Sequence, residues 1–478
     1  MEYEPVIGLE THAQLLTESK MFCCCRADYA AAPPNTLVCP VCLGLPGVLP
    51  VINRRAVEYT VMTALALNCS FPEYAKFDRK NYHYPDLPKG YQISQYDLPL
   101  SQNGWLAVDS PGGPKRIRIR RVHLEEDTAK LFHVANQGET YSLIDFNRAG
   151  VPLMEIVTEH DFASVDEVRQ YIIKLRAILR YLGVCSGDME TGAMRFEANI
   201  SLRPKGSDKY GTKVEVKNLN SFRAVLKSLQ YEIDRQARLL EEGGRVKQET
   251  MGWDDVGNVT VVQRSKEEAD DYRYFPEPDL PPLALSREWI ESLRARLPEL
   301  PDAKRQRLVA QYSITHYDAG ILTGEKALAD YFEACAARHP NAKAVANWIT
   351  RDLLQLLNST NTPIEACPVT PDGLAQMLKL MDDGIISSKL AKTVFEEMFK
   401  DGKGPEEIVA ARGLVQISDA SQIESIVEEV MAANPRAVAD FRAGKEPALT
   451  FLVGQVMKAT RGRASPALAN EILRRKLH

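Results

Sequence analysis

Hydrophobic and polar residues alternate along several stretches of the first half of the chain, a pattern typical of half-buried β-strands. Between residues 4 and 15 the apolar side chains fall on one face, whereas Glu10 and His12 fall on the other. Because alternate side chains of a strand point the same way, Glu10 and His12 are expected to project together. Residues 195–203 and 212–217 repeat the pattern, so several strands of this region turn a charged face outward.

A change of phase marks the segment 116–126. Its apolar positions before and after Arg120 and Arg121 are out of step by one residue, which predicts a β-bulge at these arginines. A bulge re-aims the side chains that follow it. Those side chains are acidic: Glu125, Glu126 and Asp127.

Two other segments of this region have the period of amphipathic helices. Residues 164–182 open with a capping box formed by Ser164 and Glu167 and end at Gly183. Residues 221–242 end before a Gly-Gly pair. Their apolar stripes are those of helices that pack against a core.

Beyond the proline-rich run that begins at Phe275, almost every segment has a helical period. A weaker break falls at residues 400–405, where an Asp-Gly-Lys-Gly-Pro run separates two groups of predicted helices. We therefore expect an α+β protein, with a β-rich amino-terminal domain that contains a few helices, followed by all-helical domains. The predicted domains are residues 1–290, 291–403 and 404–478.

The composition of the 478 residues is that of an ordinary soluble protein, with 45% hydrophobic residues, 26% charged residues and a formal net charge of −5. The length exceeds what one hydrophobic core usually supports and suggests two or three domains. No apolar run approaches the roughly 20 residues of a transmembrane helix, and the first residues do not resemble a signal peptide. The cytoplasm, without membrane association, is the expected location.

Four of the nine cysteines have the spacing of a small zinc-binding loop, expected within residues 21–45. The predicted ligands of a structural zinc ion are Cys23, Cys25, Cys39 and Cys42. We prefer Cys23 and Cys25 to Cys24 because alternate side chains point the same way, but Cys24 stays a possible competing ligand. Reduced thiols without a metal are the alternative.

The last stretch of the chain is locally basic although the whole chain is acidic. From Phe451 to His478, six basic residues stand against Glu471 alone. They are Lys458, Arg461, Arg463, Arg474, Arg475 and Lys476. Such a cluster either binds the phosphates of a nucleic acid or is a solvated helix face.

Several motifs match one family in order along the chain. They are Gly-Leu-Glu10-Thr-His12, the two cysteine motifs, Lys76-Phe-Asp-Arg-Lys80-Asn, Tyr84 to Gln95, His123-Leu-Glu-Glu126-Asp, Asp271 to Pro278 and Phe451 to Lys458. With these motifs the chain resembles the B subunit of bacterial glutamyl-/aspartyl-tRNA amidotransferase. The resemblance covers essentially the whole sequence.

The resemblance implies an enzyme that uses ATP and ammonia to convert mischarged Glu-tRNA(Gln), and often Asp-tRNA(Asn), into the amides. The B subunit of this family resembles a kinase that phosphorylates the side-chain carboxylate, after which ammonia displaces the phosphate. The ammonia derives from glutamine and comes from the A subunit, an amidase, which acts together with the small C subunit. In the family the amino-terminal domain is a cradle for ATP, and the helical tail approaches tRNA.

The family's motifs also imply functional residues. The implied catalytic residues are Glu10, His12, Lys80, Glu125 and Glu126, and the implied magnesium ligands are Glu10, His12, Glu126 and Glu197. Acyl-phosphate formation gathers negative charge, so it needs divalent cations and fixed cations such as Lys80, with Arg79 as a second candidate. Oxygen ligands with few imidazoles suit magnesium. The family usually has Asp where this chain has Glu197, which puts the role of that carboxylate in question.

Two kinds of motif are absent from the sequence, and their absence indicates which steps a partner chain would carry out and how ATP would be held. No Ser/Lys amidase signature and no glutaminase cysteine motif is present, so ammonia is expected from a partner. No Walker-type loop is present either, so strands are expected to hold ATP. The alternative function is a non-catalytic, zinc-stabilised tRNA-binding scaffold; a free-standing ligase for a small amino acid fits the basic tail less well.

Overall fold

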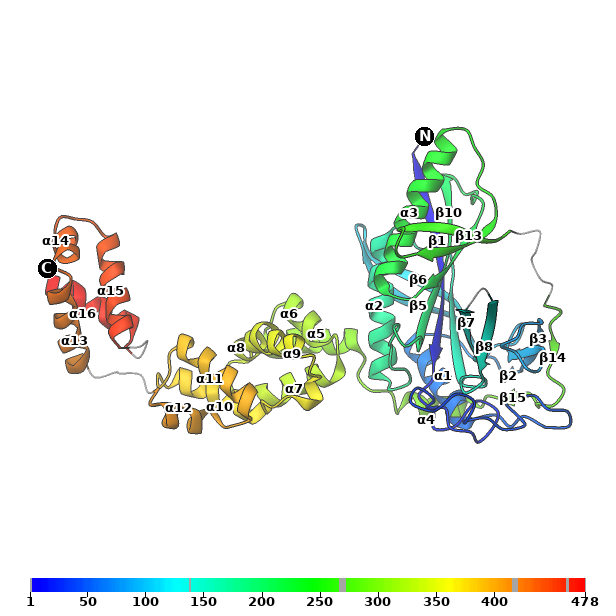
Figure 1. The fold of residues 1–478 in the computed structure, drawn as a ribbon, viewed down its shortest axis with the longest axis horizontal. Helices are drawn as coiled ribbons and strands as arrows, with labels where there is room; N and C mark the ends of the chain where they lie inside the picture. Colours follow the sequence, from blue (N-terminus) through cyan, green and yellow to red (C-terminus); the bar gives the residue numbers. More distant parts are fainter. Residues whose placement is uncertain (1, 137–138, 266–271, 415–419, 461–463, 478) are drawn as a thin grey trace. The chain divides into compact units, whose positions relative to one another are not determined.

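The computed structural model describes residues 2–136, 139–265, 272–414, 420–460 and 464–477. The chain divides into two compact units, Met1–Pro301 and Asp302–His478. The sheets lie in the first unit and the second is built of helices (Figure 1), so the predicted α+β class is confirmed. The domain boundaries at 290/291 and 403/404 stay predictions.

An eight-stranded sheet forms the centre of the first unit, in the order β13-β12-β11-β10-β1-β9-β6-β5. Its neighbouring strands are antiparallel, except that β11 and β12 are parallel. The strands are β1 (Tyr3–Gln14), β5 (Ser101–Ser110), β6 (Gly113–Glu126), β9 (Pro152–Thr158), β10 (Met194–Pro204), β11 (Val214–Leu219), β12 (Glu249–Asp254) and β13 (Val259–Ser265).

Three helices, α1 (Arg54–Ala66), α2 (Val165–Tyr181) and α3 (Phe222–Glu241), pack on this sheet. The helices α2 and α3 begin at Ser164 and Ser221, whose hydroxyls accept hydrogen bonds from backbone N–H groups of the first turn. These serines satisfy donors that a helix start leaves without a partner. The two helices predicted from the sequence are thereby confirmed.

The alternation in β1 and the bulge in β6 are also confirmed. Ile7 and Leu9 are buried in the core that the sheet forms with the three helices, whereas Glu10 and His12 are half-buried on the other face. The register between β6 and β9 shifts between Ile119 and Arg121. The helices therefore cover the apolar face, and the opposite face is left for polar side chains.

Three small sheets complete the first unit. They are β14-β3-β4 (Phe275–Pro276, Asp78–Asn81, Tyr91–Ser94), β15-β2 (Leu283–Ala284, Tyr74–Ala75) and the hairpin β7-β8 (Lys130–Asn136, Glu139–Asp145). Strand β4 contacts β6, which brings the β3-β4 pair to the end of β6 that carries the acidic residues. The short helix α4 (Arg287–Arg294) packs on α1.

The described helices of the second unit form two core clusters. The helices around the first cluster are α5 (Pro301–Tyr312), α6 (His316–Leu322), α7 (Lys326–Ala336), α8 (Ala342–Asn347), the π-helix η2 (Trp348–Leu353), α9 (Leu354–Thr360), η3 (Ile364–Ala366), α10 (Pro371–Asp382), α11 (Ser388–Asp401) and α12 (Pro405–Arg412). The helices around the second are α13 (Ala420–Ala433), α14 (Pro435–Arg442), α15 (Pro447–Ala459) and α16 (Pro466–Leu477). Ile408 and Val409 of α12 belong to the first cluster, so α12 packs with the helices that precede the predicted break at 400–405.

Among the described residues, no helix is long and apolar enough to cross a membrane.

Candidate active site

A cluster of two carboxylates and two imidazoles lies on the polar face of the sheet, where β1, β9 and β6 are neighbours. His12 Nε2 is 3.6 Å from Glu125 Oε1 and 3.7 Å from Glu155 Oε2. His123 Nε2 is 3.2 Å from the same oxygen of Glu155. The register explains the cluster, because Glu155 of β9 is paired with His12 on one side and His123 on the other.

Hydrogen bonds and charge fix these carboxylates. The Ser94 hydroxyl donates to Glu125 Oε2 at 3.0 Å, which ties β4 to the cluster. Burial by itself raises the pKa of Glu155, but His123, His12 and Lys80 outweigh burial and hold that pKa below its ordinary range. Glu155 is therefore a buried, ionised carboxylate beside two imidazoles and the Lys80 ammonium.

A second carboxylate group lies beside the first on strands β1, β10 and β11. It consists of Glu10, Glu197 and Glu215, each with a carboxylate oxygen within 4.8 Å of the others. Lys217 Nζ is 2.9 Å from Glu197 Oε2. Burial, together with neighbouring carboxylates including Glu155, raises the pKa of Glu10, so this site gathers more negative charge than Lys217 offsets.

Asn199 adds an oxygen to this second group. Its Nδ2 donates to Glu10 Oε1 at 2.9 Å, while its buried Oδ1 has no hydrogen-bond partner among the described residues. A buried amide oxygen without a partner is costly, so it is available to a ligand.

Lys80 points toward the first cluster from β3. Its ammonium lies 4.8 Å from the ring centroid of Tyr272 and 5.9 Å from that of Tyr82, and it makes no hydrogen bond or ion pair with any residue that the structure describes. Burial lowers the pKa of Lys80, but the charges of Glu125 and other neighbours outweigh burial and raise it. Lys80 is thus a charged group whose three N–H donors are free for a ligand.

Arg79, the second candidate cation, is already occupied. Its guanidinium donates from Nε and Nη2 to the two oxygens of buried Glu277, at 2.7 and 2.8 Å, and stacks over Tyr91. This two-point ion pair anchors β14 to β3. The Arg79 guanidinium is therefore committed to contacts within the protein.

Glu126 does not join Glu10 and His12. Its Oε1 accepts hydrogen bonds from Lys89 Nζ at 2.5 Å and from the backbone N–H of Ile93 at 3.0 Å. It lines a cavity of about 230 Å³ together with cysteine-loop residues. Gly44 of that loop has a φ of 64° and approaches Lys89 so closely that a Cβ there would lie 2.1 Å from Lys89 Cγ.

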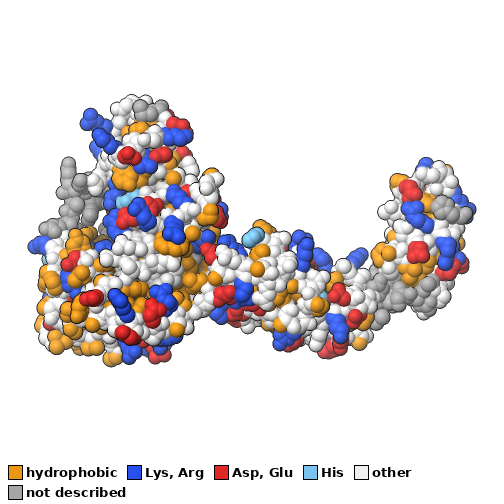
Figure 2. Space-filling view, turned by 180° about the vertical axis from the view of Figure 1, so that it is seen from behind, with side chains coloured by type: hydrophobic (Ala, Val, Ile, Leu, Met, Phe, Trp, Pro, Cys, Tyr) orange, Lys and Arg blue, Asp and Glu red, His pale blue; other side chains and the backbone are white. Residues whose placement is uncertain are grey.

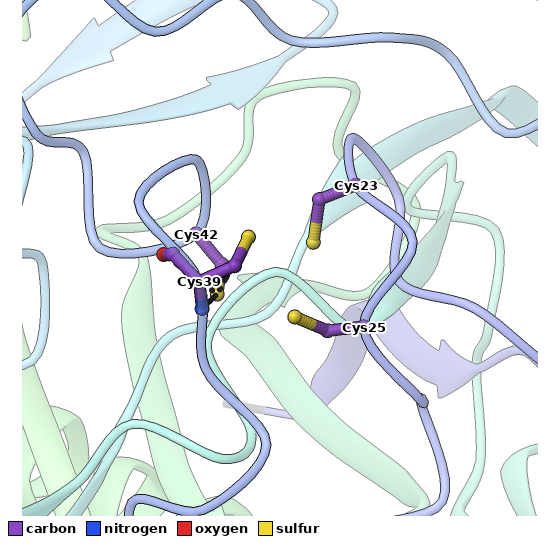
Figure 3. A group of neighbouring side chains, drawn as sticks. All are labelled: Cys23, Cys25, Cys39 and Cys42. Carbon is purple, nitrogen blue, oxygen red and sulfur yellow. Dashed lines mark hydrogen bonds between the residues drawn. The ribbon is translucent and has the colours of Figure 1, made fainter.

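The four predicted cysteine ligands come together. Figure 3 shows the side chains of Cys23, Cys25, Cys39 and Cys42 facing one small space, and their sulfur atoms lie within 4.8 Å of one another. Cys24 is exposed and is not part of this group. The arrangement is that of four thiols able to hold a metal ion.

A buried lysine lies beside the cysteine group and can offset the charge of a thiolate there. Lys20 is fully buried and its Nζ lies 2.8 Å from the carbonyl of Leu37 and 3.6 Å from Cys42 Sγ. The hydrogen bond from the Cys23 thiol, the backbone N–H of Cys39 and Lys20 lower the pKa of Cys42 to about 4, although burial opposes them. The same hydrogen bond and burial raise the pKa of Cys23, and burial raises the pKa of Cys25 to about 11, so Cys42 is the thiolate of the group. A thiolate is the form of cysteine that binds metal.

Three of the predicted tRNA-binding residues form ion pairs within the second unit. Arg474 pairs with Glu446, Arg475 with Glu424, and Lys476 with both Glu424 and Glu428. Lys458 is exposed and has no ion pair among the described residues. Arg461 and Arg463 lie outside the described residues.

Sequence reasoning missed four residues of the sheet face: His123, Glu155, Glu215 and Lys217. Glu155 carried a usable signal, since it is the single charged residue in β9, whose other residues are apolar except Thr158. A carboxylate in a strand that is buried along its length needs a partner, which marks it as a candidate ligand or catalytic group. His123 and the other two required the strand pairing, which the sequence does not reveal.

Comparisons with known proteins agree along the whole chain. Residues 5–291 match the family "GatB/GatE catalytic domain", and residues 330–477 match the family "GatB domain". The B subunit of aspartyl/glutamyl-tRNA(Asn/Gln) amidotransferase from Carboxydothermus hydrogenoformans is 57% identical over 100% of this chain and 99% of its own length. Proteins with the same name from Moorella thermoacetica and Caldanaerobacter subterraneus are 58% and 54% identical over 100% of both chains. The chain therefore belongs to the family of B subunits of aspartyl/glutamyl-tRNA(Asn/Gln) amidotransferase.

Proposed function

We propose that this chain phosphorylates the side-chain carboxylate of the amino acid on mischarged Glu-tRNA(Gln) or Asp-tRNA(Asn) with ATP, and that ammonia then displaces the phosphate. The observation that carries the proposal is the free ammonium of Lys80 facing the His12, Glu125 and Glu155 cluster on one face of the sheet. The names of the relatives, which specify these tRNAs and an amidotransferase, support it.

Two bonds between heavy atoms form and two break in this reaction. The substrate carboxylate attacks the γ-phosphorus, and the bond from that phosphorus to the oxygen of ADP breaks. Ammonia then attacks the acyl carbon, the carbon–oxygen bond to phosphate breaks, and the nitrogen gives up one proton to the released phosphate or to water. Phosphorylation is needed because a carboxylate oxygen is a poor leaving group and phosphate is a good one.

Both carboxylate groups fit magnesium by their donors, which are oxygens with one imidazole. We propose His12, Glu125 and Glu155 as one ligand set and Glu10, Glu197 and Glu215, with the Oδ1 of Asn199, as a second. Magnesium held there would offset the charge of the ATP phosphates. Glu125 and Glu155 take the place that the family motif gives to Glu126, since Glu126 points to Lys89.

Lys80 is the group that acts directly on the reacting atoms. Its three donors make no hydrogen bond or ion pair among the described residues, while the charges of Glu125 and Glu155 and the rings of Tyr272 and Tyr82 stabilise its ammonium. It can therefore hydrogen-bond the oxygens of the transferring phosphoryl group or of the acyl phosphate as their charge develops. We assign it the stabilisation of that charge.

We propose a structural zinc ion at the four cysteines, whose thiols meet the donor set and spacing of such a site. Because the sequence has no amidase motif, we propose that glutamine-derived ammonia comes from the A subunit, an amidase, acting with the small C subunit. We also propose that the basic tail binds tRNA and that the enzyme works in the cytoplasm.

The test is ATP hydrolysis by the complex reconstituted with its partner subunits. Phosphate release should require mischarged tRNA and should be absent with uncharged tRNA, and it should not require glutamine. A Lys80→Met variant should bind the same tRNA with wild-type affinity but release little phosphate. A chain that binds mischarged tRNA without supporting any ATP hydrolysis would instead be the non-catalytic scaffold.

A further inference from the structure

A groove of about 530 Å³ on the first core cluster of the second unit carries cations without partners among the described residues. Its lining includes Tyr317 of α6, Lys343 and Asn347 of α8, and Arg351 of the π-helix η2. We infer that this groove binds backbone phosphates of the tRNA substrate, an inference that rests on the proposed function.

The π-helical turn aligns the two cations. Eight residues of regular α-helix advance by about 80° beyond two full turns, which would carry Arg351 away from the face of Lys343. The wider π turn takes up this drift, so both side chains line the same groove with Asn347 between them. Such turns are frequent at functional sites because they re-aim side chains at a cost in helix regularity.

Ion pairing distinguishes Arg351 from the other described arginines in this part of the unit. Figure 2 shows basic and acidic side chains intermixed over the visible face of the second unit, so the abundance of basic residues marks no site there. Among the described arginines between residues 302 and 414, Arg351 is the one without an ion pair; the others are Arg305, Arg307, Arg338 and Arg412. Lys343 and Asn347 also have no polar partner in the described structure, whereas Asp352, next to Arg351, pairs with Lys392.

Tyr317 and Asp318 define the rest of the groove. The Tyr317 side chain is 77% exposed, although tyrosine rings in folded proteins usually pack much of their apolar surface against other residues. An exposed ring beside unpaired cations suits RNA, because a base or ribose can stack on the ring while phosphates meet the cations. Asp318 also lines the groove and accepts a hydrogen bond from Thr315 at 2.6 Å, but its one carboxylate stands against the two cations Lys343 and Arg351, so the net charge offered to a ligand is positive.

The test is tRNA binding by the full chain carrying Lys343→Ala and Arg351→Ala, measured with a fluorescent mischarged tRNA at salt concentrations from about 50 to 200 mM. We expect affinity to fall on the order of tenfold and the salt slope to flatten by about 1.5, because the variant can no longer neutralise two phosphates. The matched control is Lys389→Ala with Lys400→Ala, which removes two lysines that lie outside the groove and have no ion pair in the described part of the same unit. It should bind like the wild type.

Equal losses of tRNA affinity in the two double variants would overturn the inference that the groove binds tRNA, since the change in net charge alone would then explain both losses. Wild-type affinity and salt slope in the Lys343/Arg351 variant would overturn it as well, provided that circular dichroism shows an intact fold. In both cases tRNA-dependent ATP hydrolysis by the wild type would leave the proposed function standing. A wild type that binds no tRNA would overturn both proposals.

Discussion

Glu125 and Glu126 are consecutive residues of β6, yet their carboxylates point to opposite sides of the strand. Glu125 faces His12 across the sheet, and Glu126 binds Lys89 beside the cysteine loop. The alternation of a strand requires this separation. We therefore place Glu125 in the proposed magnesium site in preference to Glu126.

The first prediction separates these two carboxylates. Glu125→Gln and Glu155→Gln should each lower tRNA-dependent ATP hydrolysis by about 100-fold or more, because each removes a charged ligand from the proposed site. Glu126→Gln should retain hydrolysis within a few fold of the wild type. Phosphate release by the reconstituted complex measures all three, and a Glu126 variant as impaired as the Glu125 variant would return Glu126 to the site.

The second prediction concerns the free ammonium of Lys80. Lys80→Met should lower kcat by about 100- to 1000-fold with little change in tRNA affinity, because the missing donors act on charge that develops during the reaction. Lys76→Met is the matched control, since Lys76 pairs with Asp78 and Asp97 and does not face the cluster. Similar losses of activity in both variants would mean that the mutations disturb β3 and its surroundings instead of the chemistry.

The third prediction concerns the cysteine group. The purified, reduced protein should contain one zinc ion per chain by elemental analysis, and Cys39→Ser should lose it. Cys24→Ser should keep the metal, because the Cys24 side chain is exposed and outside the group. Metal loss in the Cys24 variant, or no zinc in the wild type, would refute the assignment of ligands.

Local sequence patterns were enough to predict the strands and helices that build the site. They could not predict which residues of neighbouring strands lie next to each other. The alternation around Glu10 and His12, the bulge before Glu125 and the caps of α2 and α3 depend on neighbours in sequence, and all were predictable. Glu155 joins the cluster only because β9 lies between β1 and β6, and that strand order arises from long-range pairing. The assignment of Glu126 came from the family motif, which does not distinguish the two sides of a strand.

The fourth prediction concerns Asp127, which follows the site residues and is buried. Burial alone would raise its pKa, but Arg195 and Arg148 outweigh burial and lower the pKa from 3.8 to about 2. A carboxyl group whose pKa is lower in the folded than in the unfolded state stabilises the fold at every pH above its unfolded pKa. This stabilisation is lost as the pH falls toward 2. The contribution at neutral pH is about 2 kcal/mol.

Asp127→Asn should therefore lower the free energy of unfolding at pH 7 by at least about 2 kcal/mol, because it also leaves Arg195 without its carboxylate. The difference between the variant and the wild type should shrink between about pH 4 and pH 2.5, where the wild-type carboxylate becomes protonated. Urea unfolding at these pH values measures it. A difference that does not change with pH would show that charge is not the cause.

The last prediction concerns the basic tail, where the structure divides residues that the sequence grouped together. Arg474 donates to both oxygens of Glu446, so its charge is partly offset, whereas the exposed Lys458 has no ion pair within the described residues. A protein that neutralises a phosphate releases counterions, and each cation removed from such a position should flatten the salt dependence of tRNA affinity by about 0.7 to 0.9. Lys458→Ala should show that change, and Arg474→Ala should show less of it.

The double variant Arg461→Ala with Arg463→Ala, predicted from the sequence, should flatten the slope by about 1.5 and raise the KM for mischarged tRNA. Its kcat at saturating tRNA should stay near that of the wild type, because these groups would position the substrate without touching the reacting carboxylate. If Lys458→Ala and the Arg461/Arg463 variant both bind tRNA with the wild-type salt slope, the tail is a solvated surface. The residues that meet the tRNA phosphates would then have to lie elsewhere on the chain.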